Sequence, residues 1–211
     1  MLVVIDYGMG NLNSIVNMIK KVGGSARVSD EPEVIRKAEK LILPGVGAFD
    51  TGMKNLLRSG LKGVLEDQVL ERSVPIMGIC LGMQLLTRRS EEGEEPGLGW
   101  IDAETKRFDF GSNPTSLKIP HMGWNTVLPR SRSGLFAGFD DTLRFYFVHS
   151  YYCECEKPDD IKATAVHGVE FTCAFGKGNI VGTQFHPEKS HRFGRTLLRN
   201  FLAFDPKLPG W

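Results

Sequence analysis

The first half of the chain alternates short apolar runs with segments whose apolar residues recur at helical spacing. The apolar runs predict strands at 2–5, 26–29, 41–43 and 74–79. The helical segments fall at 12–22, 32–38, 52–72 with a break near Gly60, and 81–89. Because strand and helix alternate, this half is expected to form a mostly parallel sheet with helices on both faces.

The second half has a different pattern. An acidic, glycine-containing stretch at 90–99 indicates a surface loop, and strand-like segments follow at 145–155, 163–175 and 179–185. Apolar residues at helical spacing near the C-terminus predict a last helix; they are Phe193, Leu197, Leu198 and Phe201. No repeat or low-complexity linker divides the chain, so we expect a single α/β domain over 1–211 with an added β-rich C-terminal part.

Charge and composition narrow the function classes. The sequence has 26 Lys plus Arg against 25 Asp plus Glu, a formal net charge of +1, which gives no electrostatic reason to expect nucleic acid or an anionic membrane as a partner. No apolar run approaches the ~20 residues of a membrane helix, and 2–5 is too short for the apolar part of a signal peptide. A cytoplasmic protein with free thiols is expected, and neither the cysteine nor the histidine spacing matches a metal site.

A candidate nucleophile lies where the 74–79 strand turns into a helix. Cys80 stands between glycines in Gly78-Ile79-Cys80-Leu81-Gly82, which is the sulfur version of the Gly-x-Ser-x-Gly nucleophile elbow. A helix N-terminus favours the thiolate, and the Leu81 amide would face the oxygen on the attacked carbon. An isolated cysteine at this position is more often a packed, unreactive thiol, and the flanking glycines make the two interpretations about equal.

Two further segments carry matching chemistry. In an extended segment residues two apart face the same way, so His186 and Glu188 of Gln184-Phe185-His186-Pro187-Glu188 are expected to be neighbours, with the carboxylate orienting the imidazole. Pro44-Gly45-Val46-Gly47 follows a strand, and its glycines would let backbone amides approach a ligand as an oxyanion hole requires. Taken alone, these segments are also compatible with a surface histidine and an ordinary turn.

These residues together resemble the class I, or triad, glutamine amidotransferases. The resemblance rests on 44–49, 78–86 and 184–190, in the family's order and spacing over nearly the whole chain. Within the family the chain is most similar to the glutaminase subunits of imidazole glycerol phosphate synthase, a likeness carried by Asp6-Tyr7-Gly8-Met9-Gly10-Asn11-Leu12, by Pro120-His121-Met122-Gly123-Trp124-Asn125 and by 146–152.

The resemblance implies a flavodoxin-like three-layer α/β fold and a Cys80–His186–Glu188 triad that releases ammonia from glutamine through a thioester. It implies an oxyanion hole from Val46, Gly47 and Leu81, and a glutamine pocket that uses Gly47, Gln84, His149, Ser150 and Tyr151. No cofactor is implied. We further expect the 44–47 loop to be mobile, with a partner setting the orientation of the Val46–Gly47 peptide.

The implied partner is a synthase (cyclase) subunit of (β/α)8 barrel fold in a heterodimer. It would use the ammonia to make imidazole glycerol phosphate and an aminoimidazole carboxamide ribonucleotide in histidine biosynthesis. The expected contact residues are Asn11, Asn13, Met122, Gly123, Trp124, Tyr146 and Lys189. Departures from the family pattern are small: Thr183 replaces an aliphatic residue, and Asn13 stands where a basic residue is common, which weakens that contact.

Two other functions stay open at this stage. One is a glutaminase that feeds anthranilate, guanylate or pyridoxal phosphate synthesis, against which the 120–125 motif argues. The other is a non-catalytic partner subunit that only stabilises a synthase, against which the presence of Cys80, His186 and Glu188 argues.

Overall fold

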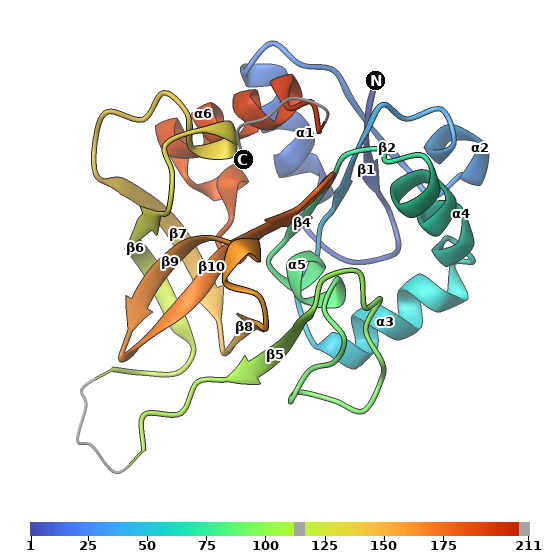
Figure 1. The fold of residues 1–211 in the computed structure, drawn as a ribbon. Coiled ribbons are helices and arrows are strands. Elements are labelled where there is room, and N and C mark those ends of the chain that lie inside the picture. The colour runs from blue at the N-terminus through green and yellow to red at the C-terminus, as the bar shows by residue number, and fades with distance from the viewer. Residues whose placement is uncertain (112–116, 207–211) are drawn as a thin grey trace.

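A computed structural model describes residues 1–111 and 117–206. Its N-terminal part contains β1 (Leu2–Ile5), α1 (Leu12–Lys21), β2 (Ala26–Ser29), α2 (Pro32–Ile35), β3 (Lys40–Leu43), α3 (Phe49–Arg58), α4 (Lys62–Glu66), a π-helical turn (Asp67–Glu71), β4 (Ile76–Ile79) and α5 (Leu81–Leu85). The remaining elements are β5 (Ala103–Arg107), β6 (His121–Pro129), β7 (Leu143–His149), β8 (Tyr151–Cys155), β9 (Ile161–His167), β10 (Val169–Lys177), β11 (Ile180–Thr183), 3-10 turns at Gly134–Phe136, Pro158–Asp160 and η4 (Pro187–Lys189), and α6 (His191–Ala203). Figure 1 shows their arrangement.

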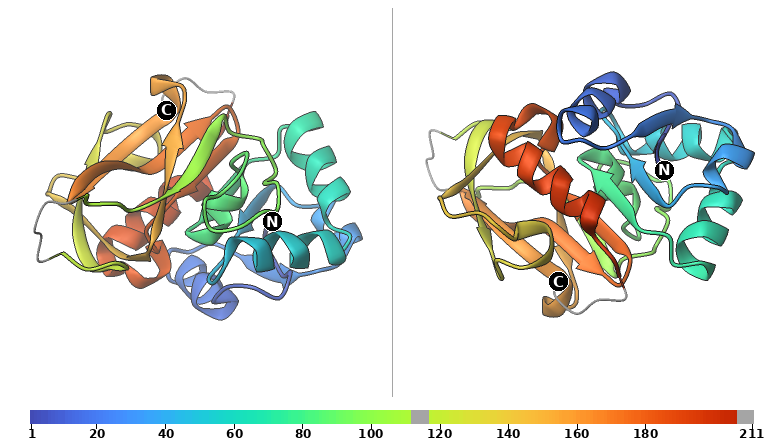
Figure 2. Two further views of the ribbon diagram at one scale, coloured as in Figure 1. Left: turned by 90° about the horizontal axis from the view of Figure 1, so that it is seen from below. Right: turned by 90° about the horizontal axis from the view of Figure 1, so that it is seen from above.

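One mixed sheet runs through the molecule in the order β2-β1-β3-β4-β11-β10-β9-β6-β7, with β5 and β8 attached at β10. The strands from β2 to β11 are parallel, and those beyond β11 are antiparallel. The α/β class with a mostly parallel N-terminal sheet, expected from the alternating pattern, is therefore confirmed. In both views of Figure 2 the helix-covered N-terminal half lies beside the β-rich part.

Two apolar cores lie on opposite faces of the parallel strands. Leu2 and Val4 of β1 pack with α1 and α6, whereas Val3 and Ile5 pack with α3 and α4. This division follows from strand geometry, since successive side chains point to opposite faces. The strand is buried on both sides, which explains why β1 is a continuous apolar run.

Several sequence-based boundaries are wrong. The helix expected at 81–89 ends at Leu85, and the one at 52–72 is three segments (α3, α4 and the π-helical turn), separated near Gly60 as expected. The β-rich segment expected at 145–155 consists of two strands, β7 and β8, which pair with different neighbours, and the segment expected at 163–175 consists of β9 and β10. Strands β5 and β6 were not predicted. Among the described residues, no helix is long and apolar enough to cross a membrane.

Candidate active site

The sheet order brings three distant segments to one edge. Strands β3, β4 and β11 are parallel neighbours, so their carboxyl ends lie side by side. Pro44 follows β3, Cys80 follows β4, and His186 comes shortly after β11. The carboxyl edge of parallel strands is where α/β proteins bind ligands. This order explains how residues about a hundred positions apart meet.

Cys80 sits in a strained turn between β4 and α5. Its backbone has φ 54° and ψ −110°, an unusual conformation for a residue with a side chain. The turn needs glycines on both sides: a Cβ at Gly82 would lie 1.9 Å from the Leu43 carbonyl oxygen, and one at Gly78 would lie 2.7 Å from the Gly82 carbonyl oxygen. The elbow geometry expected from the sequence is present.

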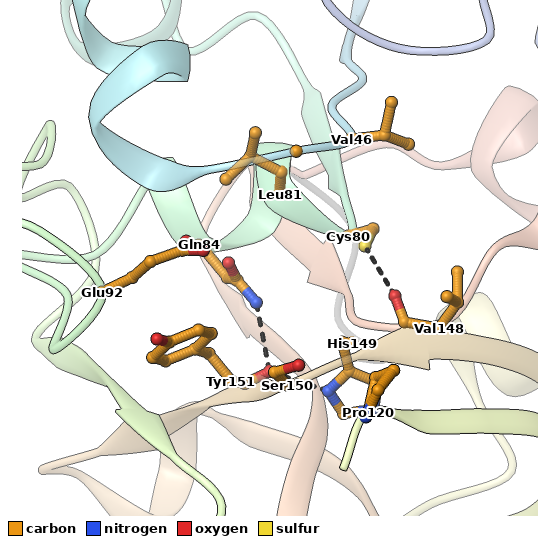
Figure 3. Close-up of a pocket in the computed structure, with 11 residues that line it drawn as sticks. Val46, Cys80, Leu81, Gln84, Glu92, Pro120, Val148, His149, Ser150 and Tyr151 are labelled. Carbon is orange, nitrogen blue, oxygen red and sulfur yellow. Dashed lines mark hydrogen bonds between the residues drawn. The ribbon is translucent and has the colours of Figure 1, made fainter.

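The Cys80 thiol is 6% exposed and opens onto a cavity of about 270 Å³. Its Sγ lies 3.9 Å from the Val148 carbonyl oxygen, to which it donates (Figure 3). Because Leu81 is the first residue of α5, its amide has no acceptor within the helix and is available to an anionic oxygen. The cavity is lined by Val46, Gly47, Cys80, Leu81, Gln84, Glu92, Pro120, Val148, His149, Ser150 and Tyr151.

His186 and Glu188 are in direct contact. The Nδ1 of His186 lies 2.8 Å from Oε1 of Glu188, and both side chains are almost fully buried. The expected reason for this contact is wrong: β11 ends at Thr183, and Glu188 reaches the ring because Pro187–Lys189 form a 3-10 turn. The turn is fixed by Ser190, whose hydroxyl donates to the His186 carbonyl and accepts from the Tyr146 amide.

The other ring nitrogen of His186 is set up to exchange a proton with the sulfur. Nε2 is buried and has no hydrogen-bond partner among the described residues. Burial lowers the pKa of His186, but its interactions with the Cys80 thiolate and Glu188 outweigh burial and raise the pKa to about 10. The imidazole is therefore held protonated at neutral pH when the sulfur is ionised, which is the charge state of an activated Cys–His pair.

The loop from Pro44 to Phe49 is held at both ends and exposed between them. The Tyr7 hydroxyl donates to the Pro44 carbonyl, and the Phe49 amide donates to Glu92 Oε2 at 2.8 Å. Between these anchors Val46 is 42% exposed, and Gly47 has φ +109°. Such a loop can reorient its central peptide without losing its attachment points.

The predicted glutamine-pocket residues line the same cavity. The Gln84 side chain is 5% exposed and is not the solvated helix residue that a surface position would give. Its Nε2 donates to the Tyr151 carbonyl at 3.1 Å, as Figure 3 shows. The His149 ring is 6% exposed, and its Nδ1 lies 2.7 Å from the same carbonyl oxygen. Ser150 and Tyr151 complete this wall.

Glu92 is a cavity residue that the sequence did not reveal, because the 90–99 stretch has no periodicity and was expected to be a surface loop. It lines the cavity together with Ser150 and Tyr151. A carboxylate there can bind a cationic group such as the α-ammonium of an amino acid. Among the described residues, no group of three or more His, Cys, Asp or Glu side chains is arranged to hold a metal ion.

The residues expected at a partner interface are mostly exposed. Met122 is 63% and Trp124 39% exposed on β6, so Trp124 is not a core residue. The Trp124 ring stacks on His191 at 5.5 Å and meets Tyr146 edge-on, and Lys189 lies over the Tyr146 ring. Asn11 and Asn13 are exposed at the start of α1, where the Asn11 side chain caps the helix.

The α/β fold, with a cysteine elbow and a His–Glu pair at the carboxyl ends of β3, β4 and β11, is typical of one class of protein. Comparison with known families identifies that class. The family model of class-I glutamine amidotransferases matches residues 3–204, and the chain belongs to that family. Solved structures agree on the fold: a glutamine amidotransferase crystal structure superposes with a TM-score of 0.74 at 21% identity, covering 95% of this chain and 97% of that one. PurLQS from Thermotoga maritima gives 0.72 at 18% identity, covering 96% of this chain and 97% of that one.

Relatives of higher identity share one name. Imidazole glycerol phosphate synthase subunit HisH 2 of Pseudomonas aeruginosa is 54% identical over 96% of this chain and 98% of its own length. The protein of the same name from Methanococcus maripaludis is 52% identical with the same coverage. Subunit HisH of Leptospira borgpetersenii is 45% identical over 96% of this chain and its whole length.

Proposed function

We propose that this chain is the glutaminase subunit of an imidazole glycerol phosphate synthase and that Cys80, His186 and Glu188 are its catalytic triad. The observation that carries the proposal is the strained Cys80 elbow beside the buried His186–Glu188 pair, at the mouth of a cavity sized for a small ligand. The names and identity of the full-length relatives support the choice of synthase.

In the first half-reaction the Cys80 thiolate attacks the side-chain amide carbon of glutamine. The carbonyl oxygen becomes an oxyanion, which the Leu81 amide and a reoriented Gly47 amide stabilise. Protonated His186 gives its Nε2 proton to the departing nitrogen, so ammonia leaves and a thioester remains. Glu188 holds Nδ1 and stabilises the imidazolium.

In the second half-reaction water attacks the thioester, and His186 accepts its proton. A second oxyanion collapses, glutamate leaves, and the sulfur returns to its starting state. Gln84, His149, Ser150 and Tyr151 form one wall of the glutamine pocket. Glu92 binds the α-ammonium group, because a carboxylate is the complementary partner for that charge.

The partner is a synthase (cyclase) subunit of (β/α)8 barrel fold that receives the ammonia and forms imidazole glycerol phosphate. It binds the exposed surface that carries Met122, Gly123, Trp124, Tyr146 and Lys189, together with Asn11 and Asn13 at the start of α1. Binding reorients the Val46–Gly47 peptide in the doubly anchored loop and so completes the oxyanion hole. We assign this chemistry to the cytoplasm, where the catalytic thiol stays reduced.

The decisive experiment compares wild type with Cys80→Ala, each combined with the barrel subunit. With glutamine as nitrogen donor the variant should make no imidazole glycerol phosphate, whereas with added ammonium salt both complexes should make it at equal rates. Glutamine-dependent synthesis by the Cys80→Ala complex would overturn the triad. Transfer of ammonia only to an anthranilate, guanylate or pyridoxal phosphate synthase would overturn the choice of partner. Failure of the wild-type complex to hydrolyse glutamine would show a non-catalytic subunit.

A further inference from the structure

In and behind the cavity wall, buried polar side chains from four parts of the fold are joined to the Cys80 sulfur by hydrogen bonds, either directly or through the Tyr151 carbonyl. They include His121 of β6, His149 of β7, Gln84 of α5 and Gln184 after β11. Each of these side chains is at most 6% exposed. Buried polar groups that are hydrogen-bonded to one another constrain which atom is donor and which is acceptor.

The donor and acceptor roles in these hydrogen bonds can be assigned from one backbone carbonyl, that of Tyr151. The Tyr151 oxygen can only accept, so Nδ1 of His149, 2.7 Å away, must carry a proton. Burial is the main reason that the pKa of His149 is lowered to about 3, so the neutral ring has no second proton. Its Nε2 is therefore an acceptor, and Nδ1 of His121, at 2.9 Å, is the donor.

The donor and acceptor roles of His121 are fixed in the same way. Burial also lowers the pKa of His121, to about 4, so its Nε2 is an acceptor. Asn125 donates to it from Nδ2 at 3.1 Å and to the Val166 carbonyl at 2.8 Å. The amide orientation of Asn125 is set independently, because its Oδ1 accepts from the Thr126 amide at 2.7 Å.

Gln84 and Gln184 link the same Tyr151 carbonyl to the Cys80 sulfur. Gln84 Nε2 uses both of its protons, one on the Tyr151 carbonyl and one on Gln184 Oε1, each at 3.1 Å. Because the side-chain oxygen of Gln184 faces Gln84, its amide nitrogen must lie on the opposite side of the amide group. That nitrogen lies 3.7 Å from Cys80 Sγ.

We propose that Gln184 is a hydrogen-bond donor to the Cys80 sulfur and that Gln84, itself oriented by the Tyr151 carbonyl, fixes the orientation of the Gln184 amide. A neutral donor fixed in this direction stabilises the thiolate in addition to His186, and it holds the sulfur beside the cavity. The inference rests on Cys80 being the nucleophile of the proposed glutaminase. The test of this inference uses no glutamine turnover, so the inference and the proposed glutaminase function can fail separately.

The test measures the rate at which iodoacetamide alkylates Cys80, read by mass spectrometry of the peptide that contains it. Gln184→Met has nearly the shape of glutamine but no donor, so the alkylation rate near neutral pH should fall about tenfold, the usual worth of one hydrogen bond to a charged acceptor. The matched control is Thr183→Val, which changes the adjacent buried residue and removes its bond to the Phe185 carbonyl. This control should be alkylated at the wild-type rate.

The pH profile separates thiolate stabilisation from altered access. Tyr7, Cys153 and His186 interact electrostatically with Cys80, and His149 and Glu92 line the same cavity. Burial raises the pKa values of Tyr7 and Cys153, that of His149 is lowered to about 3, and that of His186 is raised to about 10. Tyr7, Cys153, His149 and His186 do not titrate between pH 6 and 9, so a deficit of Gln184→Met that varies with pH in this range comes from the sulfur, whereas a purely steric deficit is the same at every pH.

Two results would overturn the proposal. One is a Gln184→Met alkylation rate equal to that of wild type, or a deficit that is the same at every pH and hence steric. The other comes from Gln84, whose amide nitrogen orients Gln184 by donating to its Oε1. Gln84→Met removes that donor, so it should lower the alkylation rate of Cys80 as Gln184→Met does. A wild-type rate in Gln84→Met would show that Gln84 does not orient Gln184.

Discussion

At the scale of single residues, the site depends on charges that stabilise one another. The Cys80 thiolate is among the causes that raise the pKa of His186 to about 10, although burial alone would lower it. Removing the sulfur leaves burial opposed only by Glu188. Cys80→Ala should therefore lower the pKa of His186, measured by NMR titration of its ring. A pKa unchanged in this variant would mean that Glu188 alone sets the charge of the ring.

Glu92 lines the cavity, and its Oε2 accepts a hydrogen bond from the Phe49 amide. Glu92→Gln keeps an acceptor for that amide but removes the charge offered to a bound amino acid. The KM for glutamine should rise about tenfold or more, because hydrogen bonds to charged groups are worth ~1.5–3 kcal/mol. The kcat should change much less, since the α-ammonium lies away from the reacting carbon. Steady-state kinetics with the partner present would measure both, and an unchanged KM would remove Glu92 from the pocket.

At the scale of elements, the proposed oxyanion hole depends on the backbone conformation of the 44–49 loop. Gly47 has φ +109°, which residues with a Cβ rarely adopt. Gly47→Ala should therefore lower partner-stimulated glutaminase turnover by about 100-fold or more, the usual effect of losing one oxyanion donor. Gly60→Ala, at a positive-φ turn with open space around it, is the matched control for backbone strain alone. Equal turnover by Gly47→Ala and Gly60→Ala would show that the Gly47 amide takes no part in the oxyanion hole.

The elements also show what the sequence can and cannot predict. Strand β1 and the Cys80 elbow were predictable, because their apolar run and glycine spacing are local signals. Strand β6 was not, since its residues alternate poorly in burial and it pairs with β7 over one part and β9 over another. The proximity of Cys80 to His186 depends on β4 and β11 being neighbours, and a pairing between strands so far apart in sequence leaves no periodic pattern. Glu92 and Gln184 gain their positions from tertiary packing alone.

At the scale of the whole molecule, the buried histidines make the fold sensitive to acid. The pKa values of His121 and His149 are lowered from 6.5 to about 4 and about 3 by burial. Between these values and 6.5 the unfolded chain binds protons that the folded protein does not. The free energy of unfolding therefore falls as pH drops below 6.5, by about 2 kcal/mol for each histidine at pH 5. His186 has the opposite sign: its raised pKa contributes stability that is complete below 6.5 and is lost as pH rises through about 10.

This prediction is tested by chemical denaturation at pH 7 and pH 5. The Asn side chain places a donor where Nδ1 of histidine lies but has no group that titrates in this range. His121→Asn should therefore lose about half as much unfolding free energy on acidification as wild type, as linkage requires for one of two such groups. An equal loss in both proteins would mean that carboxylates elsewhere, and not these histidines, account for the acid sensitivity.

The exposed face of β6 should decide assembly with the partner. Trp124 is 39% exposed and is held by stacking on His191, so little side-chain freedom remains to be lost when a partner covers it. Buried tryptophans at interfaces often contribute 2 kcal/mol or more, so Trp124→Ala should raise the Kd of the complex by roughly 30-fold or more. Leu128→Ala is the control, because Leu128 is 53% exposed on the same strand but outside the predicted contact surface. Calorimetric titration with the barrel subunit would measure both. Equal weakening by the two variants would show that the interface extends along β6 to Leu128. Wild-type affinity of Trp124→Ala would show that Trp124 lies outside the interface.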